Sequence, residues 1–152
     1  MYRQLSNLLS SLVATGDSLA PLFLRLSLGI MILPHGLQKT LGWFGGYGFN
    51  GTMGWLTGTL GAPWILALLA ILAESVGGLM LLAGIGTRLA ALGVGAVMVV
   101  AATTHWSNGF FMNWFGNQKG EGIEFHLLAV GIAVALLIMG GGRFSVDSLF
   151  RR

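Results

Sequence analysis

Residues 21–39 read PLFLRLSLGIMILPHGLQK, and this stretch decides how the rest of the chain must fold. It is apolar and long enough to cross a membrane as a helix, yet it carries Arg25, His35 and Lys39. At about 100° per residue, these three side chains fall within about 80° of one another on a helix. Gly29 and Gly36 flank that face. Because glycines let membrane helices approach and charged side chains avoid lipid, this face is predicted to lie against protein.

The composition identifies an integral membrane protein. Of the 152 residues, 55% are hydrophobic and only 9% are charged, whereas soluble domains carry roughly 25% charged residues. The length allows about four membrane spans in one domain covering residues 1–152. The net charge of +3 is too small to indicate a nucleic-acid partner. The absence of cysteine excludes disulfides, thiolate metal sites and dithiol redox chemistry.

The hydrophobic stretches predict an all-α fold with four transmembrane helices in an antiparallel bundle. The expected spans cover residues 20–39, 63–83, 89–106 and 121–140, each close to the roughly 20 residues that a crossing needs. Residues 3–14 place their apolar side chains on one helical stripe, which predicts an amphipathic helix in the membrane interface. A frayed polar leader is the alternative for that segment.

Two long loops, residues 40–62 and 107–120, are rich in glycine and in aromatic residues that suit the membrane–water interface. In the first loop, residues 50–60 are compatible with a short helix that lies flat or re-enters as a lid, and equally with an irregular loop. Five arginines lie in the N-terminal segment, the turn after the second span and the tail, against two lysines in the long loops. Positive charge concentrates in the cytoplasm, so both termini are predicted there and both loops outside.

Glu74 is the acid that most needs an explanation, because it lies near the middle of the second span. An isolated charge at that depth costs about 2.5–3.5 kcal/mol on insertion scales. From the helical rise, Glu74 is expected within roughly 9 Å of both Arg25 and His35 along the membrane normal. We therefore expect Glu74 to be protonated, to pair with Arg25, or to accept a hydrogen bond from His35.

Together these residues predict a polar pocket that opens outward beneath the aromatic loops. Glu74 and His35 are the candidate catalytic groups, acting as proton partners. The residues expected to line the ligand pocket are Arg25, Lys39, His105, Glu124, Trp43 and Trp55.

Each of these side chains also has a simpler interpretation. Arg25 could snorkel to the headgroups, Lys39 could lie at the interface without a specific contact, and Glu74 could be a purely structural acid. His126 points about 160° away from Glu124 on a helix, so it is predicted to be a packing or interfacial histidine. The histidines and acids near the outer surface suit a metal by type, but no local ligand motif accompanies them, and no metal site is predicted.

Three motifs resemble those of the DoxX family of small bacterial membrane proteins. They are RLSLGIMILPHGLQK at 25–39, ESVGGLMLLAGIGTRLAA at 74–91 and GGGRFSVD at 140–147. The resemblance covers about residues 20–148 and implies a four-helix bundle in the bacterial cytoplasmic membrane. The positions that look like matches to recurring family positions are Arg25, His35, Gly36, Lys39, Glu74, Gly78, Arg88, His105 and Glu124.

The family name derives from a subunit of an archaeal terminal quinol oxidase, and other members resemble partners of detoxifying enzymes in a membrane oxidoreductase complex. The resemblance therefore implies a quinone as ligand or cofactor, and redox proteins as partners beside the lipid bilayer. The expected function is an accessory or quinone-interacting subunit of a membrane oxidoreductase system, which is at most a subunit of a quinone-linked enzyme. The alternatives are a docking subunit without chemistry of its own and a carrier of a small solute or lipid; a homo-oligomer also stays open.

Overall fold

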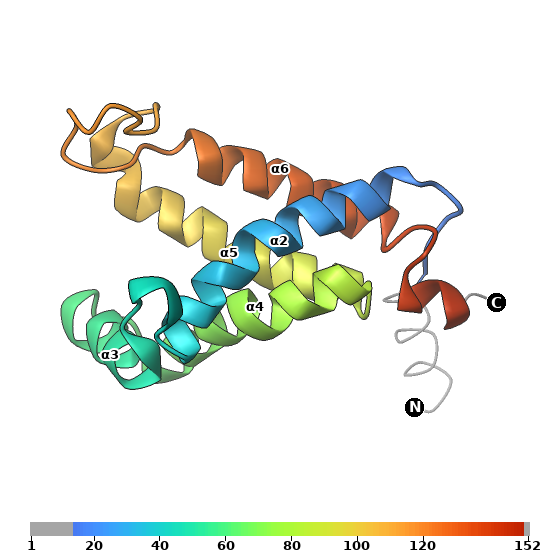
Figure 1. Ribbon diagram of the computed structural model, residues 1–152, viewed down its shortest axis with the longest axis horizontal. Coiled ribbons are helices and arrows are strands. Elements are labelled where there is room, and N and C mark those ends of the chain that lie inside the picture. Colours follow the sequence, from blue (N-terminus) through green and yellow to red (C-terminus); the bar gives the residue numbers. More distant parts are fainter. Residues whose placement is uncertain (1–13, 151–152) are drawn as a thin grey trace.

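Four long helices build the part of the chain that a computed structural model describes, residues 14–150. They are α2 (Ala20–Thr40), α4 (Trp64–Ala83), α5 (Thr87–His105) and α6 (Glu124–Met139), and no strand occurs among the described residues. The helices lie lengthwise beside one another and alternate in direction (Figure 1). Helix α2 packs against α4, α4 against α5, and α5 against α6. A weaker contact between α6 and α2 completes the four-helix arrangement. The interfacial helix predicted over residues 3–14 lies outside the described residues.

Three of these segments are long and apolar enough to cross a membrane: α2, α4 and the stretch Thr87–Asn108, in which the short helix η3 (Trp106–Asn108) continues α5. The prediction of an all-helical membrane protein is confirmed in this form. The fourth helix, α6, is apolar but has only 16 residues. Its length of about 24 Å falls short of the roughly 30 Å of bilayer hydrocarbon. The predicted span 121–140 was too long at its start, because the chain becomes helical only at Glu124.

The first long loop is folded rather than irregular. It contains η1 (Trp43–Gly45), α3 (Gly48–Gly54) and η2 (Trp55–Thr59), so the helical alternative was the better prediction, although the helix begins two residues earlier than expected. Met53 of α3 is buried in a small cluster with Ala67 and Ile71 of α4. The loop therefore packs back onto one end of α2 and α4 (Figure 1). We call this end, which also carries the second loop, the loop end.

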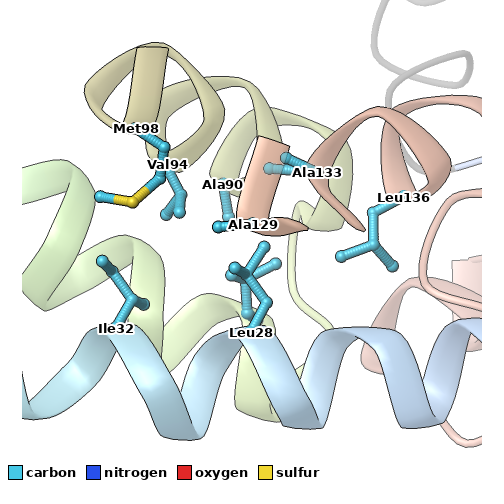
Figure 2. Packing of buried hydrophobic residues seen from close by; sticks show 10 residues of the cluster. Leu28, Ile32, Ala90, Val94, Met98, Ala129, Ala133 and Leu136 are labelled. Carbon is cyan, nitrogen blue, oxygen red and sulfur yellow. The ribbon is translucent and has the colours of Figure 1, made fainter. Parts of the chain in front are cut away.

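The main core lies between the four helices, where alanines pack among larger apolar side chains (Figure 2). Lipid offers no hydrophobic driving force between membrane helices, so close packing must hold them together. Alanines on α5 and α6 let these two helices approach, and side chains from α2 fill the space in front of them. The labelled core residues are Leu28, Ile32, Ala90, Val94, Met98, Ala129, Ala133 and Leu136.

Helices α2 and α4 lie backbone to backbone at Gly36. A Cβ atom at this position would lie 2.5 Å from the Cα and backbone N of Ser75, a distance that no real side chain adopts. Nearer the middle of the helices, a Cβ at Gly78 would lie 3.2 Å from the Cα of Leu33. Only glycine allows backbones to meet in this way, and the contact brings Glu74 directly against α2.

The C-terminal segment folds under the opposite end, which we call the tail end. Its last helix, η4 (Val146–Phe150), contains the buried residue Asp147. The Asp147 carboxylate accepts hydrogen bonds from the backbone N–H groups of Gly86 and Thr87, at 2.7 and 2.9 Å. These are unsatisfied donors at the start of α5, where a carboxylate is favourable. The tail therefore caps α5 and is held to the α4–α5 turn.

Candidate functional site

An ion pair joins α2 and α4 near the loop end. Glu74 of α4 is only 3% exposed, and its carboxylate accepts a charge-assisted hydrogen bond from the Lys39 ammonium group. The Lys39 side chain keeps 31% of its surface exposed, so it lies at the edge of the bundle and reaches inward. The simpler interpretation of Lys39, an interfacial charge without a specific contact, is therefore wrong.

Arg25 lies toward the tail end, about 21 Å along α2 from Lys39. It is 2% exposed, and within residues 14–150 its hydrogen bonds go to backbone carbonyls. These carbonyls are Leu81 and Leu82 at the end of α4, at 3.2 and 2.5 Å, and Gly141 and Phe144 of the tail, at 3.2 and 2.6 Å. The last carbonyls of a helix have no partner within it, and Arg25 supplies one. The predicted pairing of Arg25 with Glu74 is wrong, and so is snorkelling to the headgroups.

The three histidines of the chain come from three helices and gather toward the loop end. The rings of His105 on α5 and His126 on α6 lie 4.9 Å apart between centroids, with 34° between their planes. His35 of α2 is exposed. His126 is therefore a packing histidine, as predicted, although its packing partner is another histidine. His35 makes no hydrogen bond to Glu74 among the described residues.

The His126 ring is incompletely satisfied. Its Nδ1 atom is buried and has no hydrogen-bond partner within residues 14–150. The backbone of Gly122 lies near the ring, but its geometry does not complete a hydrogen bond to that nitrogen. On His105, by contrast, Nδ1 lies 2.9 Å from the carbonyl oxygen of Ala101. In the described part of the chain, no group of three or more His, Asp or Glu side chains is arranged to hold a metal ion.

The acids of the second loop have separate roles. The Glu121 carboxylate accepts a hydrogen bond from the backbone N–H of Asn113 at 2.7 Å, and the Asn108 side chain donates to the Glu121 carbonyl at 3.0 Å. Glu121 therefore shapes the loop. Glu124 opens α6, its backbone N–H donates to the Phe110 carbonyl at 2.9 Å, and its side chain faces a groove.

That groove is an open surface groove along α6, to which α2 contributes Leu24, and it has a volume of about 500 Å³. A smaller cavity of about 150 Å³ lies between the same two helices. The groove lining is apolar except at Glu124. The lining residues of the larger groove are Leu24, Glu124, Leu127, Leu128, Gly131, Ile132 and Ala135.

The six residues predicted to line one pocket therefore do not converge. Lys39 lies with Glu74, His105 lies with His126, Arg25 binds the tail, and Glu124 faces the groove. The two remaining residues, Trp43 and Trp55, are exposed on the first loop. Arg25 and Lys39 differ most from the prediction, because their partners are set by how the helices and the tail pack.

Asp147 is the structural residue that sequence reasoning missed. It belongs to the tail motif at 140–147 and is one of only five acidic residues in the chain. In so acid-poor a chain, a carboxylate following a glycine-rich segment was a usable signal. Its target, the start of α5 sixty residues earlier, was not visible without the fold.

Comparison with known protein families gives one match: the sequence model described as DoxX fits residues 20–106. The match covers α2, the first loop, α4 and α5, which is more than half of the 152-residue chain. It includes both partners of the Lys39–Glu74 ion pair. No curated protein and no solved structure matches the chain.

Proposed function

This chain belongs to the DoxX family, and from that premise we propose that it is an integral membrane subunit of an oxidoreductase system that interacts with a quinone. In this role a partner oxidoreductase supplies or takes up the electrons. The membrane subunit holds the ligand in the bilayer and exchanges protons with it. The motifs on α2 and α4 resemble the DoxX family, whose name derives from a subunit of a quinol oxidase, and this resemblance supports the quinone-linked role.

The observation that carries the proposal is the Lys39–Glu74 pair. A carboxylate at 3% exposure, in a helix of a membrane protein, is costly unless it is paired, and such acids usually mark ligand or proton paths. Its partner is not fully enclosed, because Lys39 keeps about a third of its surface exposed. The pair can therefore open and free the carboxylate for proton exchange. Quinone reduction takes up protons, so a buried acid is a suitable group.

His35 is the second proton partner in this proposal. It is exposed on α2, one residue before the glycine that contacts the backbone of Ser75. The two ring nitrogens of a histidine can accept and donate protons, so this side chain can pass protons between solvent and a ligand.

We place the protein in the bacterial cytoplasmic membrane with both termini in the cytoplasm. In this topology all four long helices cross the bilayer as an antiparallel bundle, and both aromatic loops lie outside. The excess of arginine at the termini and the α4–α5 turn supports the orientation. The short α6 then requires the aromatic second loop to lie in the interfacial region, where tryptophan and phenylalanine are favourable.

A docking subunit without chemistry of its own is the second candidate. The observation in its favour is the second loop, where Trp114 and Phe115 are 80% and 90% exposed. Large exposed apolar side chains held on an ordered loop are typical of interaction surfaces. In this case Lys39–Glu74 would serve only to fasten α2 to α4.

The experiment compares the wild-type protein with the variants Glu74→Gln and Glu121→Gln, purified in mild detergent. Co-purifying molecules are identified by mass spectrometry and visible absorbance. We expect a quinone in the wild type and in Glu121→Gln, because Glu121 only shapes the second loop, and its loss in Glu74→Gln. If Glu74→Gln folds normally and retains the quinone, the role of Glu74 is wrong. If none of the three proteins carries a quinone, the docking function is favoured.

A further inference from the structure

Phe144 in the tail has a backbone conformation that phenylalanine rarely adopts. Its φ angle is +63°, in the left-handed region, where the side chain of any residue other than glycine is crowded. Two nearby tail residues with positive φ, Gly140 and Gly142, are glycines, as expected. The ring of Phe144 does not compensate by packing in the core, because the residue is 65% exposed. A bulky residue in a strained conformation, with its ring outside the fold, indicates a function for that ring.

Hydrogen bonds on both sides hold the backbone in this conformation. The Phe144 carbonyl accepts a hydrogen bond from the Arg25 guanidinium at 2.6 Å. The backbone N–H of Arg143 donates to the Ser18 carbonyl at 3.1 Å. The next residue, Ser145, is only 4% exposed and fixes the chain from the inside. The side chains of Arg143 and Phe144 therefore extend outward from a backbone that is held in place.

A second phenylalanine at positive φ lies at the loop end. Phe44 has a φ angle of +53° and is 67% exposed, and its carbonyl accepts a hydrogen bond from the Gln38 side chain of α2 at 3.2 Å. The neighbours of the two rings differ. The Trp43 ring lies 6.4 Å from that of Phe44, between centroids, whereas the Arg143 guanidinium lies 5.1 Å from the centre of the Phe144 ring. Of these two strained phenylalanines, the one in the tail is therefore paired with a cation.

The tail is bound to a turn that belongs at a membrane surface. Helix α4 and the segment that begins with α5 are each long enough to cross a bilayer, so the short turn between them lies where one leaves the membrane and the other enters it. The Asp147 carboxylate binds the N–H groups of Gly86 and Thr87 in this turn. The backbone N–H of Asp147 donates to the Gly84 carbonyl at 2.9 Å. The tail is folded against this end of the bundle (Figure 1), which places its outward side chains at the depth of lipid head groups.

The chemistry of this surface is complementary to a phospholipid with a negative head group. The exposed Arg143 guanidinium offers the planar fork of N–H donors that binds phosphate oxygens. Apolar side chains accompany it, because Leu149 and Phe150 of η4 are 78% and 66% exposed in addition to Phe144. Asp147 is the one acid in the sequence of the tail, and its carboxylate is buried and bound to α5. A free phosphate ion would leave the apolar side chains in water, whereas a lipid covers both parts.

We infer that Arg143 and Phe144 form a binding site for an anionic phospholipid, with the phosphate on the guanidinium and the Phe144 ring against the apolar part of the lipid. Basic residues next to a membrane span attract anionic lipids, and the aromatic ring adds apolar contact. A lipid bound here stabilises the segment that caps α5. The inference is independent of the quinone-linked function, because the Lys39–Glu74 pair takes no part in it.

Native mass spectrometry of the whole protein in mild detergent tests the inference. The protein is titrated with phosphatidylglycerol and, separately, with phosphatidylcholine, and the affinity for the first bound lipid is measured. We expect the wild type to bind phosphatidylglycerol more tightly. Arg143→Gln should weaken this binding roughly tenfold or more, because charge-assisted hydrogen bonds to the phosphate are lost. Phe144→Gly should also weaken it, although the midpoint temperature of unfolding without added lipid should stay the same or rise, because glycine relieves the strain.

Two matched controls lie at the other end of the bundle. Lys119→Gln removes the same charge from an exposed position in the second loop, and Phe44→Gly relieves the same kind of backbone strain beside Trp43. Both variants should bind phosphatidylglycerol like the wild type. Arg143→Lys keeps the charge without the planar fork, so its affinity should lie between those of the wild type and Arg143→Gln.

Four results would overturn the inference. Equal affinity of the wild type for the two lipids would show that the site does not select a negative head group. Equal weakening by Lys119→Gln and Arg143→Gln would show that net charge attracts the lipid without a site. Full affinity in Phe144→Gly would remove the ring from the site. Displacement of the lipid by inorganic phosphate at equal concentration would make a free anion the occupant.

Discussion

Lys39 and Glu74 form their ion pair beside the backbone contact between α2 and α4 at Gly36. Gly36, three residues before Lys39, leaves room for the backbone of Ser75, which directly follows Glu74. The glycine contact and the ion pair therefore lie side by side and fix the same register between the two helices. Because Glu74 is almost fully buried, its carboxylate depends on Lys39 for a charged partner.

Removing Lys39 alone should destabilise the protein. Lys39→Met leaves a buried carboxylate without its partner, and we expect a loss of about 2–3 kcal/mol in the free energy of unfolding. This is below the 3–5 kcal/mol of fully enclosed pairs because Lys39 is partly exposed. The double variant Lys39→Met with Glu74→Leu should recover most of the loss, because no charge remains buried. Chemical unfolding in detergent measures the free energy of unfolding of both variants. If Lys39→Met leaves that free energy unchanged, the ion pair does not contribute to stability.

Arg25 and Glu74 should be energetically independent. Arg25 binds the end of α4 and the tail, so its contribution should add to that of Glu74 within about 0.5 kcal/mol in a double-mutant cycle. Arg25→Lys should itself be destabilising by several kcal/mol, because a lysine cannot reproduce a fork of bonds to four carbonyls. Limited proteolysis should then cleave residues 140–150 faster than in the wild type. A coupling energy as large as that of the Lys39–Glu74 pair would contradict the separate placement of Arg25.

Gly36 should be among the least replaceable residues of the chain. A methyl group there meets the backbone of α4 at 2.5 Å, so Gly36→Ala must push α2 and α4 apart. We expect a loss of about 3 kcal/mol, at the upper end of overpacking effects. Gly131→Ala is the control, since its methyl group meets open space and alanine favours the helix. The midpoint temperature of thermal unfolding should fall for Gly36→Ala and should stay the same or rise for Gly131→Ala.

Asp147 should stabilise α5 through its carboxylate. Asp147→Ala removes both hydrogen bonds to the first N–H groups of the helix and should cost about 1–2 kcal/mol. Asp147→Asn keeps one acceptor but loses the charge, so a smaller loss is expected. Hydrogen exchange of residues 86–90 measures the effect at the site itself. Unchanged exchange in both variants would mean that the tail does not cap α5 in the membrane.

The proposed topology is open to a direct test because the chain has no cysteine. Single cysteines at Gly58 and Asn117 report on the two aromatic loops, and single cysteines at Ile85 and Phe150 report on the α4–α5 turn and the tail. We expect a membrane-impermeant maleimide to label the first two in intact cells and the last two only after permeabilisation. If Asn117→Cys and Phe150→Cys respond alike, α6 does not cross the bilayer.

Several features were predictable because they are local. A run of apolar residues is long enough to span a bilayer or it is not, and this property of the sequence needs no tertiary contact. The same holds for an acid near the middle of such a run, which is how Glu74 was recognised. The start of α6 was harder to predict from the sequence, because residues 121–123 make hydrogen bonds to the second loop instead of joining the helix.

By itself, then, the sequence determined an all-helical membrane protein of the DoxX family with a costly buried acid at Glu74. Only the tertiary structure decided which cation meets that acid. The helical rise measures depth along one axis, and by depth Arg25 and His35 were the expected partners. Which side chains can meet across two helices depends on where their backbones make contact. The contact at Gly36 places Glu74 beside Lys39. Arg25 instead donates hydrogen bonds to carbonyls of the tail, more than a hundred residues away in the sequence. The periodicity of a single helix does not predict where that tail lies.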